Sequence, residues 1–218
     1  MDKKQNDLIA ELTSGLEPVK PLMSAEKRML LWSLLSFSLV FGGLYYLQPI
    51  TTDESIYRLS NIYLFLEFAL AFLPFLMCGF LVFLLGVPGR SPATKWVYTA
   101  LMPAIGFVGF VFIEKYSGAH ASSEFMGYRY YCSKEVVYFS LIPLLTITAL
   151  ALRTYVFKPL LTGSLIALSG VSLPLAIMQI SCVGDPDHTI QYHLMPLLPV
   201  VIGGAIVSTL LLKKFSKS

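Results

Sequence analysis

The sequence predicts an all-α integral membrane protein: a six-helix bundle preceded by a short cytoplasmic N-terminal tail. Of its 218 residues, 56% are hydrophobic and only 13% are charged, about half the charged fraction of an ordinary soluble domain. The mean hydropathy is +0.69. Apolar runs close to the roughly 20 residues that cross a bilayer recur along the chain, which leaves little length for a soluble domain.

Each expected span is an apolar run between polar or turn-forming residues. The runs cover residues 29–47, 61–85, 96–113, 136–152, 160–180 and 194–212. Trp32 and the pair Tyr45–Tyr46 are expected to anchor the first span at the membrane interfaces. Internal prolines are compatible with helices in a membrane, where neighbouring groups satisfy the freed carbonyls. Small residues in the fifth and sixth spans predict close helix contacts; they are Gly163, Ala167, Gly170, Gly204 and Ser208.

These runs divide the chain into three parts. Residues 1–28 form a polar tail, residues 29–212 the membrane domain, and residues 213–218 a C-terminal tail. With the N-terminus inside, the inner segments hold 12 of the 16 Lys and Arg residues and the outer loops hold four. The positive-inside rule therefore predicts that both termini are cytoplasmic.

The tail contains a short amphipathic pattern in NDLIAELTSGLEPVKPL. One face of the expected helix carries the apolar residues Leu8, Ile9, Leu12 and Leu16. Such a helix is too short to be stable alone in water. Its pattern is compatible with two roles: an anchor on the inner membrane surface, or a segment that orders in the groove of a partner protein.

Two of the three cysteines are expected at the outer face. Cys132 precedes the fourth span, which runs inward, and Cys182 follows the fifth, which runs outward. A compartment outside the cytoplasm permits disulfides, and two adjacent helix ends can bring cysteines within bonding range. Cys78 lies inside the second span, where we expect a small buried side chain.

The stretch ISCVGDPDHTIQYH (180–193) supports three interpretations. Asp185, Pro186 and Asp187 suit the start of the last helix, as cap, first residue and dipole partner. Alternatively, thiol, carboxylate and imidazole ligands suit zinc or copper, although their spacing matches no standard motif. This candidate metal set is Cys182, Asp185, Asp187, His188 and His193, with His120 as an addition. Thirdly, Cys132 and Cys182 suit a switchable redox pair.

Motifs for hydrolysis and phosphoryl transfer are absent from the sequence. We therefore expect neither an enzyme nor a cofactor. Two rival functions stay open. A membrane thiol-disulfide oxidoreductase would use Cys132 and Cys182, although no Cys-x-x-Cys pair is present. A small transporter would use Glu67, which lies about two turns inside the second span.

Three short segments are similar to one known family. DLIAELTSGLEPVKPL resembles the N-terminal pattern of the NrsF family, a Leu-Ile-x-x-Leu helix followed by Pro-Val-x-Pro. YCSKEVVYFSLIPLL and ISCVGDPDH resemble the family's two cysteine segments. The chain departs from the pattern at Ser181, where the family has His, and at Tyr192–His193, where it has an aromatic pair with Trp. The NrsF proteins are six-span anti-sigma factors of the bacterial inner membrane.

The resemblance implies a stress-responsive transcription regulator that acts by signal transduction across the membrane. Its partner would be an extracytoplasmic-function sigma factor, with no direct contact to nucleic acid. The tail would bind that partner through Leu8, Ile9, Leu12 and Leu16, continued by Pro18, Val19 and Pro21. Cys132 and Cys182 would sense the signal at the outer face, by disulfide formation or by binding a thiophilic metal. This implication favours partner binding over the membrane anchor for the tail.

Overall fold

A computed structural model describes residues 23–47, 60–87, 89, 92–117, 131–182 and 185–215. Every regular element in these ranges is helical, and six helices are long and apolar enough to cross a membrane. The predicted all-α membrane bundle is therefore confirmed. The N-terminal segment with Leu8, Ile9, Leu12, Leu16, Pro18, Val19 and Pro21 lies outside the described residues, as does His120.

The helices match the expected spans but extend beyond most of them. Their bounds are α2 (Ala25–Leu47), α4 (Ile62–Leu85), α5 (Thr94–Ser117), α6 (Cys132–Ala151), α7 (Pro159–Ser181), α8 (Pro186–His188), the π-helix η1 (Thr189–Leu194) and α9 (Met195–Phe215). The last three form one continuous helical run. Polar residues that flank the apolar runs continue the helices, because a helix satisfies its own backbone groups at the membrane surface as well as inside it.

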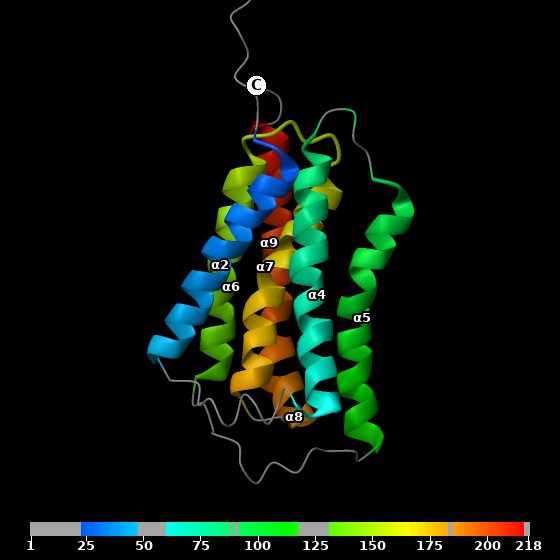
Figure 1. Cartoon of the computed structure of the whole chain (residues 1–218), viewed down its shortest axis with the longest axis vertical. Helices are drawn as coiled ribbons and strands as arrows, with labels where there is room; N and C mark the ends of the chain where they lie inside the picture. The colour runs from blue at the N-terminus through cyan, green and yellow to red at the C-terminus, as the bar shows by residue number, and fades with distance from the viewer. Residues whose placement is uncertain are drawn as a thin grey trace, which may run out of the picture.

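Helix α7 is the centre of the bundle. It packs against α4, α6 and α9, and its side chains are buried along most of its length. Helices α2 and α5 lie at opposite edges (Figure 1). Helix α2 packs against α6 and α4, whereas α5 packs mainly against α4 and touches α8. The site described below is built on the ends of the central helices.

Small residues allow the central helices to approach closely, as predicted. Leu144 of α6 fits against two glycines: a Cβ added at Gly170 of α7 would lie 2.8 Å from the Leu144 Cβ, and one at Gly204 of α9 would lie 2.6 Å from its Cδ1. Nearby, the hydroxyls of Thr148 and Ser208 are 3.1 Å apart. These contacts hold α9 close against α6 and α7.

We expect Gly170→Ala to destabilise the bundle by about 1–3 kcal/mol, the usual cost of overpacking. The added methyl group would lie 3.0 Å from the Leu144 Cα, so a backbone must move. The matched control is Gly42→Ala, which has no atom within 4 Å of the added Cβ and replaces glycine with a better helix former. Unfolding curves in mixed micelles compare the two variants. Equal stability of both variants would contradict the close contact between Gly170 and Leu144.

Trp32 is not an interface anchor, and the prediction that placed it there is wrong. Helix α2 begins at Ala25, so Trp32 lies two turns inside it, with no exposed surface. Its Nε1 donates a hydrogen bond to the Pro143 carbonyl of α6 at 3.0 Å. Its ring lies 4.5 Å from that of Phe75 on α4, centroid to centroid. Trp32 therefore joins three helices.

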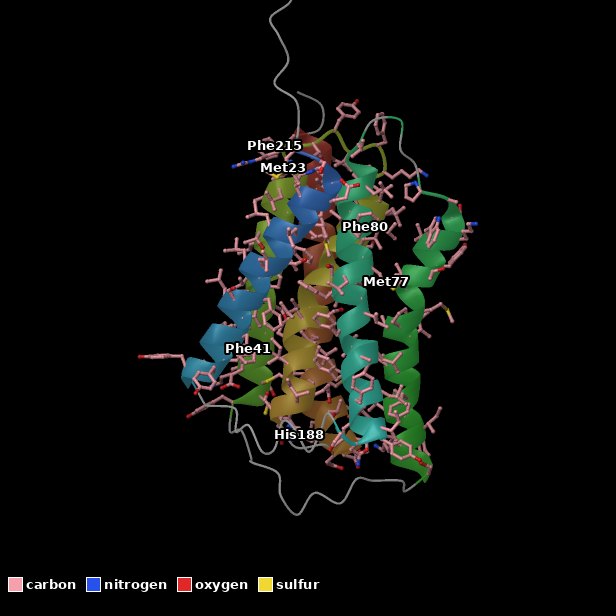
Figure 2. The ribbon with its side chains drawn as sticks, in the orientation of Figure 1. Met23, Phe41, Met77, Phe80, His188 and Phe215 are labelled. Atoms are coloured by element: carbon pink, nitrogen blue, oxygen red, sulfur yellow. The ribbon has the colours of Figure 1, made fainter. Side chains whose placement is uncertain are left out.

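The two ends of the bundle differ in what they carry. Met23, just before α2, and Phe215, the last residue of α9, lie at the same end, which we call the terminal end (Figure 2). His188 lies at the opposite end, the site end, far from Met23 and Phe215 (Figure 2). Exposed basic residues occur at the terminal end, at the start of α5, in the α6–α7 connection and in the last turn of α9; they are Lys95, Arg153, Lys158, Lys213 and Lys214.

Candidate metal and thiol site

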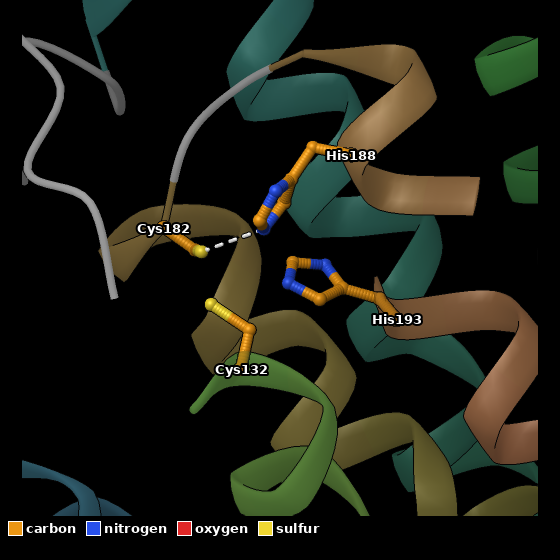
Figure 3. A group of neighbouring side chains, drawn as sticks. All are labelled: Cys132, Cys182, His188 and His193. Carbon is orange, nitrogen blue, oxygen red and sulfur yellow. Dashed lines mark hydrogen bonds between the residues drawn. The ribbon is translucent and has the colours of Figure 1, made fainter. Parts of the chain in front are cut away.

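Four side chains converge at the site end of the bundle. They are Cys132, the first residue of α6; Cys182, which caps the end of α7; His188 of α8; and His193 of η1. One ligand atom of each lies within 4.8 Å of all the others, and all four side chains are buried. Figure 3 shows the two sulfurs and two imidazoles facing a common centre. We call this set the Cys/His site.

A helix cap places His188 above Cys182. The Asp185 carboxylate accepts a hydrogen bond from the His188 backbone N–H at 3.1 Å, and Pro186 is the first residue of α8. The predicted start of the last helix is therefore confirmed. This turn directs the His188 ring back toward the end of α7, where its Nε2 lies 3.1 Å from the Cys182 Sγ (Figure 3).

The π-helix brings His193 to the same side as His188. Five positions separate the two residues, and in an α-helix that spacing turns their side chains roughly 140° apart. In a π-helix the backbone bonds join residues five apart, so their side chains lie nearly above one another. The two rings are 5.2 Å apart and perpendicular. The π-turn of η1 is thus the local feature that assembles the site.

Gln179 orients the second imidazole. Its side-chain amide lies 3.3 Å from the His193 Nδ1 and is buried in the last turns of α7. This contact occupies one ring nitrogen and aims the other, Nε2, at the centre of the site. The His193 Nε2 is buried and makes no hydrogen bond of good geometry. A buried, unsatisfied nitrogen that faces two sulfurs has the position of a metal ligand.

The surroundings of Cys182 favour its thiolate. The neighbouring Cys132 thiol hydrogen-bonds to it and lowers its pKa, and His188 and His193 lower it further, against the opposing effect of burial. Both cysteines are reduced in this structure. The thiolate is the form that binds metals and attacks disulfides. The site is therefore prepared for either chemistry.

The donor set fits a soft, tetrahedral cation. Two thiolates and two imidazoles are the ligands of Cys₂His₂ zinc sites, and they also suit copper. Bonds of 2.0–2.3 Å place tetrahedral ligands roughly 3.3–3.8 Å apart. Because the atoms here already lie within 4.8 Å of one another, movements of about an ångström would close the set. A disulfide is the alternative chemistry of this pair, since the two sulfurs lie within 4.8 Å of each other.

The structure divides the sequence-predicted metal set. Cys182, His188 and His193 come together, and Cys132 from the expected redox pair joins them. Asp185 is the helix cap, and Asp187 forms an ion pair with Lys115 of α5 at 2.6 Å. The redox pair and the metal ligands, which the sequence presented as alternatives, therefore occupy one place. Sequence reasoning missed Gln179, which has no signal apart from being an amide near the end of an apolar run.

Two other residues singled out in the sequence are not members of this set. Cys78 is fully buried in α4, and its Sγ contacts the Ala100 carbonyl at 3.5 Å, as expected of a small core side chain. Glu67 is 2% exposed and faces the bundle interior from the first turns of α4. Glu67 is therefore not a lipid-facing residue.

No family model, curated protein or solved structure matches this chain.

Proposed function

We propose that this multi-pass membrane protein is an anti-sigma factor that binds an extracytoplasmic-function sigma factor through its N-terminal tail. A signal at the Cys/His site weakens that hold, by oxidation of the two thiols or by binding of a thiophilic metal. The observation that carries the proposal is the buried Cys/His site at the end of the bundle opposite the start of α2 and the end of α9 (Figure 1). A sensor at one face and an effector at the other is the arrangement that transmembrane signalling requires.

Charge distribution supports the orientation. The exposed basic residues of the terminal end are numerous, and the positive-inside rule assigns such an end to the cytoplasm. The Cys/His site is then at the outer face of the bacterial inner membrane, where disulfides form and persist. The NrsF-like pattern of the tail supports the identity of the partner.

Packed helices lead from the site to α2, the helix that follows the tail in the sequence. Cys132 is the first residue of α6, so a change at its sulfur acts on the end of that helix. Helix α6 bonds to α2 through the Trp32 Nε1 and the Pro143 carbonyl, and α2 follows the tail in the chain. Small sliding movements of packed helices are a known means of transmission, and Trp32 would carry such movement from α6 to α2.

Co-purification with the sigma factor encoded beside the gene tests the proposal. We expect the full-length protein to retain the sigma factor and a form lacking residues 1–22 to lose it. The matched control lacks residues 213–218 at the same membrane face and should retain the partner. Equal retention by the form without residues 1–22 would refute the role of the tail.

A second experiment tests whether the Cys/His site receives the signal. In proteoliposomes that hold the complex, Zn²⁺ or a thiol oxidant added on the site side should release the sigma factor from the wild-type protein. Cys182→Ser should release it in neither case, whereas Cys78→Ala should behave as wild type. Release of the sigma factor from Cys182→Ser at the wild-type level would show that the Cys/His site does not sense the signal.

A further inference from the structure

We propose that the segment of η1 switches between two helical registers. It is a π-helix when a soft cation binds both His188 and His193, and it relaxes to an α-helix when no cation is bound. The inference deepens the proposed function by giving the site a moving part. It rests on that function for its biological use only, because the movement is measurable in the protein alone.

The relaxed form separates the two imidazoles. An α-helix through residues 186–195 would leave five positions between His188 and His193, roughly 140° apart. At most one of them could then stay with the two sulfurs. A cation would have four ligands in the π form and at most three in the α form, so it favours the π form by the difference in affinity.

Unsatisfied polar atoms in the π-turn give a reason for relaxation without a cation. The Thr189 Oγ1 and the His193 Nε2 are both buried and make no hydrogen bond of good geometry, and each such atom costs free energy. A cation bound to the Nε2 removes one of these costs. π-Turns of this kind are rare and occur often at functional sites.

Helix α8 is the part that would move. Helix α9 is fixed by the close contacts of Gly204 with Leu144 and of Thr209 with Gly163. Relaxation of the π-turn to an α-helix therefore rotates α8 about the helix axis by roughly 100°, the angle of one residue. It also shifts α8 by about 1.5 Å along that axis. At the surface of a helix 10–12 Å wide, this rotation displaces a side chain by on the order of 8 Å.

The ion pair between Lys115 and Asp187 reports this movement. It joins the last turn of α5 to α8 at 2.6 Å, and both side chains are partly or largely exposed. Asp187 precedes the ligand His188, so it leaves Lys115 when α8 rotates. The switch therefore decides whether the outer end of α5 is tied to the Cys/His site.

A carbodiimide, which joins an amine directly to a contacting carboxylate, measures the pair without adding a cysteine. We expect the Lys115–Asp187 cross-link, quantified by peptide mass spectrometry on the reduced full-length protein, to form with Zn²⁺ present. With a chelator instead, it should fall to about a tenth or less, the level of a minor conformer. Asp187→Asn identifies the cross-linked peptide by removing it.

Deletion of Gln191 provides the decisive variant. It reduces the spacing of the histidines to four, which places both on one face of an ordinary α-helix, and it leaves α8 and α9 in their present register. This variant should bind Zn²⁺ and cross-link equally with Zn²⁺ or chelator. Gln191→Ala, which keeps the chain length, should retain the Zn²⁺ dependence.

Two results would overturn the switch: a wild-type cross-link that is independent of Zn²⁺, or a Zn²⁺-dependent cross-link in the Gln191 deletion. Neither measurement involves a sigma factor. Loss of the sigma-factor proposal would therefore leave this result standing, and failure of the cross-linking test would leave sigma-factor binding by the tail untouched.

Discussion

Replacing Cys182 with serine is expected to abolish the binding of a soft divalent cation by the purified, reduced protein. The wild-type chain should bind one Co²⁺ with a thiolate-to-cobalt charge-transfer band and d–d bands of tetrahedral intensity, and Zn²⁺ should displace it. Cys182 contributes the sulfur closest to ionisation, and a serine hydroxyl is a poor ligand for such cations. The affinity should fall by more than the 10–100-fold typical of losing an outer-shell partner.

Graded variants make this prediction specific to the Cys/His site. Gln179→Leu removes only the partner of the His193 Nδ1 and should lower affinity by about 10–100-fold while keeping the charge-transfer band. Cys78→Ala removes a thiol that lies in the middle of α4 and should bind as wild type. A wild-type spectrum from Cys182→Ser, or a band lost in Cys78→Ala, would place the cation elsewhere.

Trp32→Ala is expected to cause the largest loss of stability of any single substitution in α2. The side chain is fully buried, its ring contacts those of Phe75 (tilted) and Phe83 (edge-on), and its Nε1 donates a hydrogen bond to the Pro143 carbonyl. We expect a loss of about 3 kcal/mol, at the lower end of the range for Trp→Ala in soluble cores, because helix association in a bilayer depends on packing rather than on transfer from water.

The chain offers a matched control for Trp32, because its other tryptophan, Trp96, is 55% exposed. Trp96→Ala should change stability little. Trp32→Phe keeps an aromatic ring in the core and removes the hydrogen bond, so it should cost about 1 kcal/mol. Denaturation in mixed micelles, followed by circular dichroism, measures all three. Equal losses of stability for Trp32→Ala and Trp96→Ala would contradict the buried position of Trp32 between α2, α4 and α6.

Hydropathy predicted the bundle well because a bilayer imposes one strong rule: each span needs about 20 apolar residues. The same rule explains the errors at the helix ends and at Trp32. Hydropathy detects the apolar run and not the polar turns that continue the helix. Helix α2 therefore begins four residues earlier than expected, and Trp32 lies inside the helix and in the core instead of at its end. An average over a run cannot say which side of a helix faces its neighbours.

The Cys/His site was only partly predictable. The local cap at Asp185 and Pro186 follows from short-range backbone chemistry, and the sequence showed it. Two other features did not follow from the sequence pattern. The meeting of α6 with α7 at their ends, which adds Cys132, depends on long-range packing. The π-turn of η1, which brings His193 to the side of His188, is a local irregularity that an apolar pattern does not show. A spacing of five turns two histidines away from each other in a regular α-helix. The sequence therefore named Cys182, His188 and His193 as candidate ligands without showing how one site could hold both rings.

The Cys/His site draws all four of its side chains from residues 132–193, in the second half of the chain. Synthesis proceeds from the N-terminus, and domains form as their residues emerge. A growing chain therefore exposes residues 1–22 and completes α2, α4 and α5 before a single ligand of the site has been made. During biogenesis, the segment proposed to bind the sigma factor is therefore made before the Cys/His site proposed to release it. A nascent chain would bind the sigma factor before it could respond to the signal.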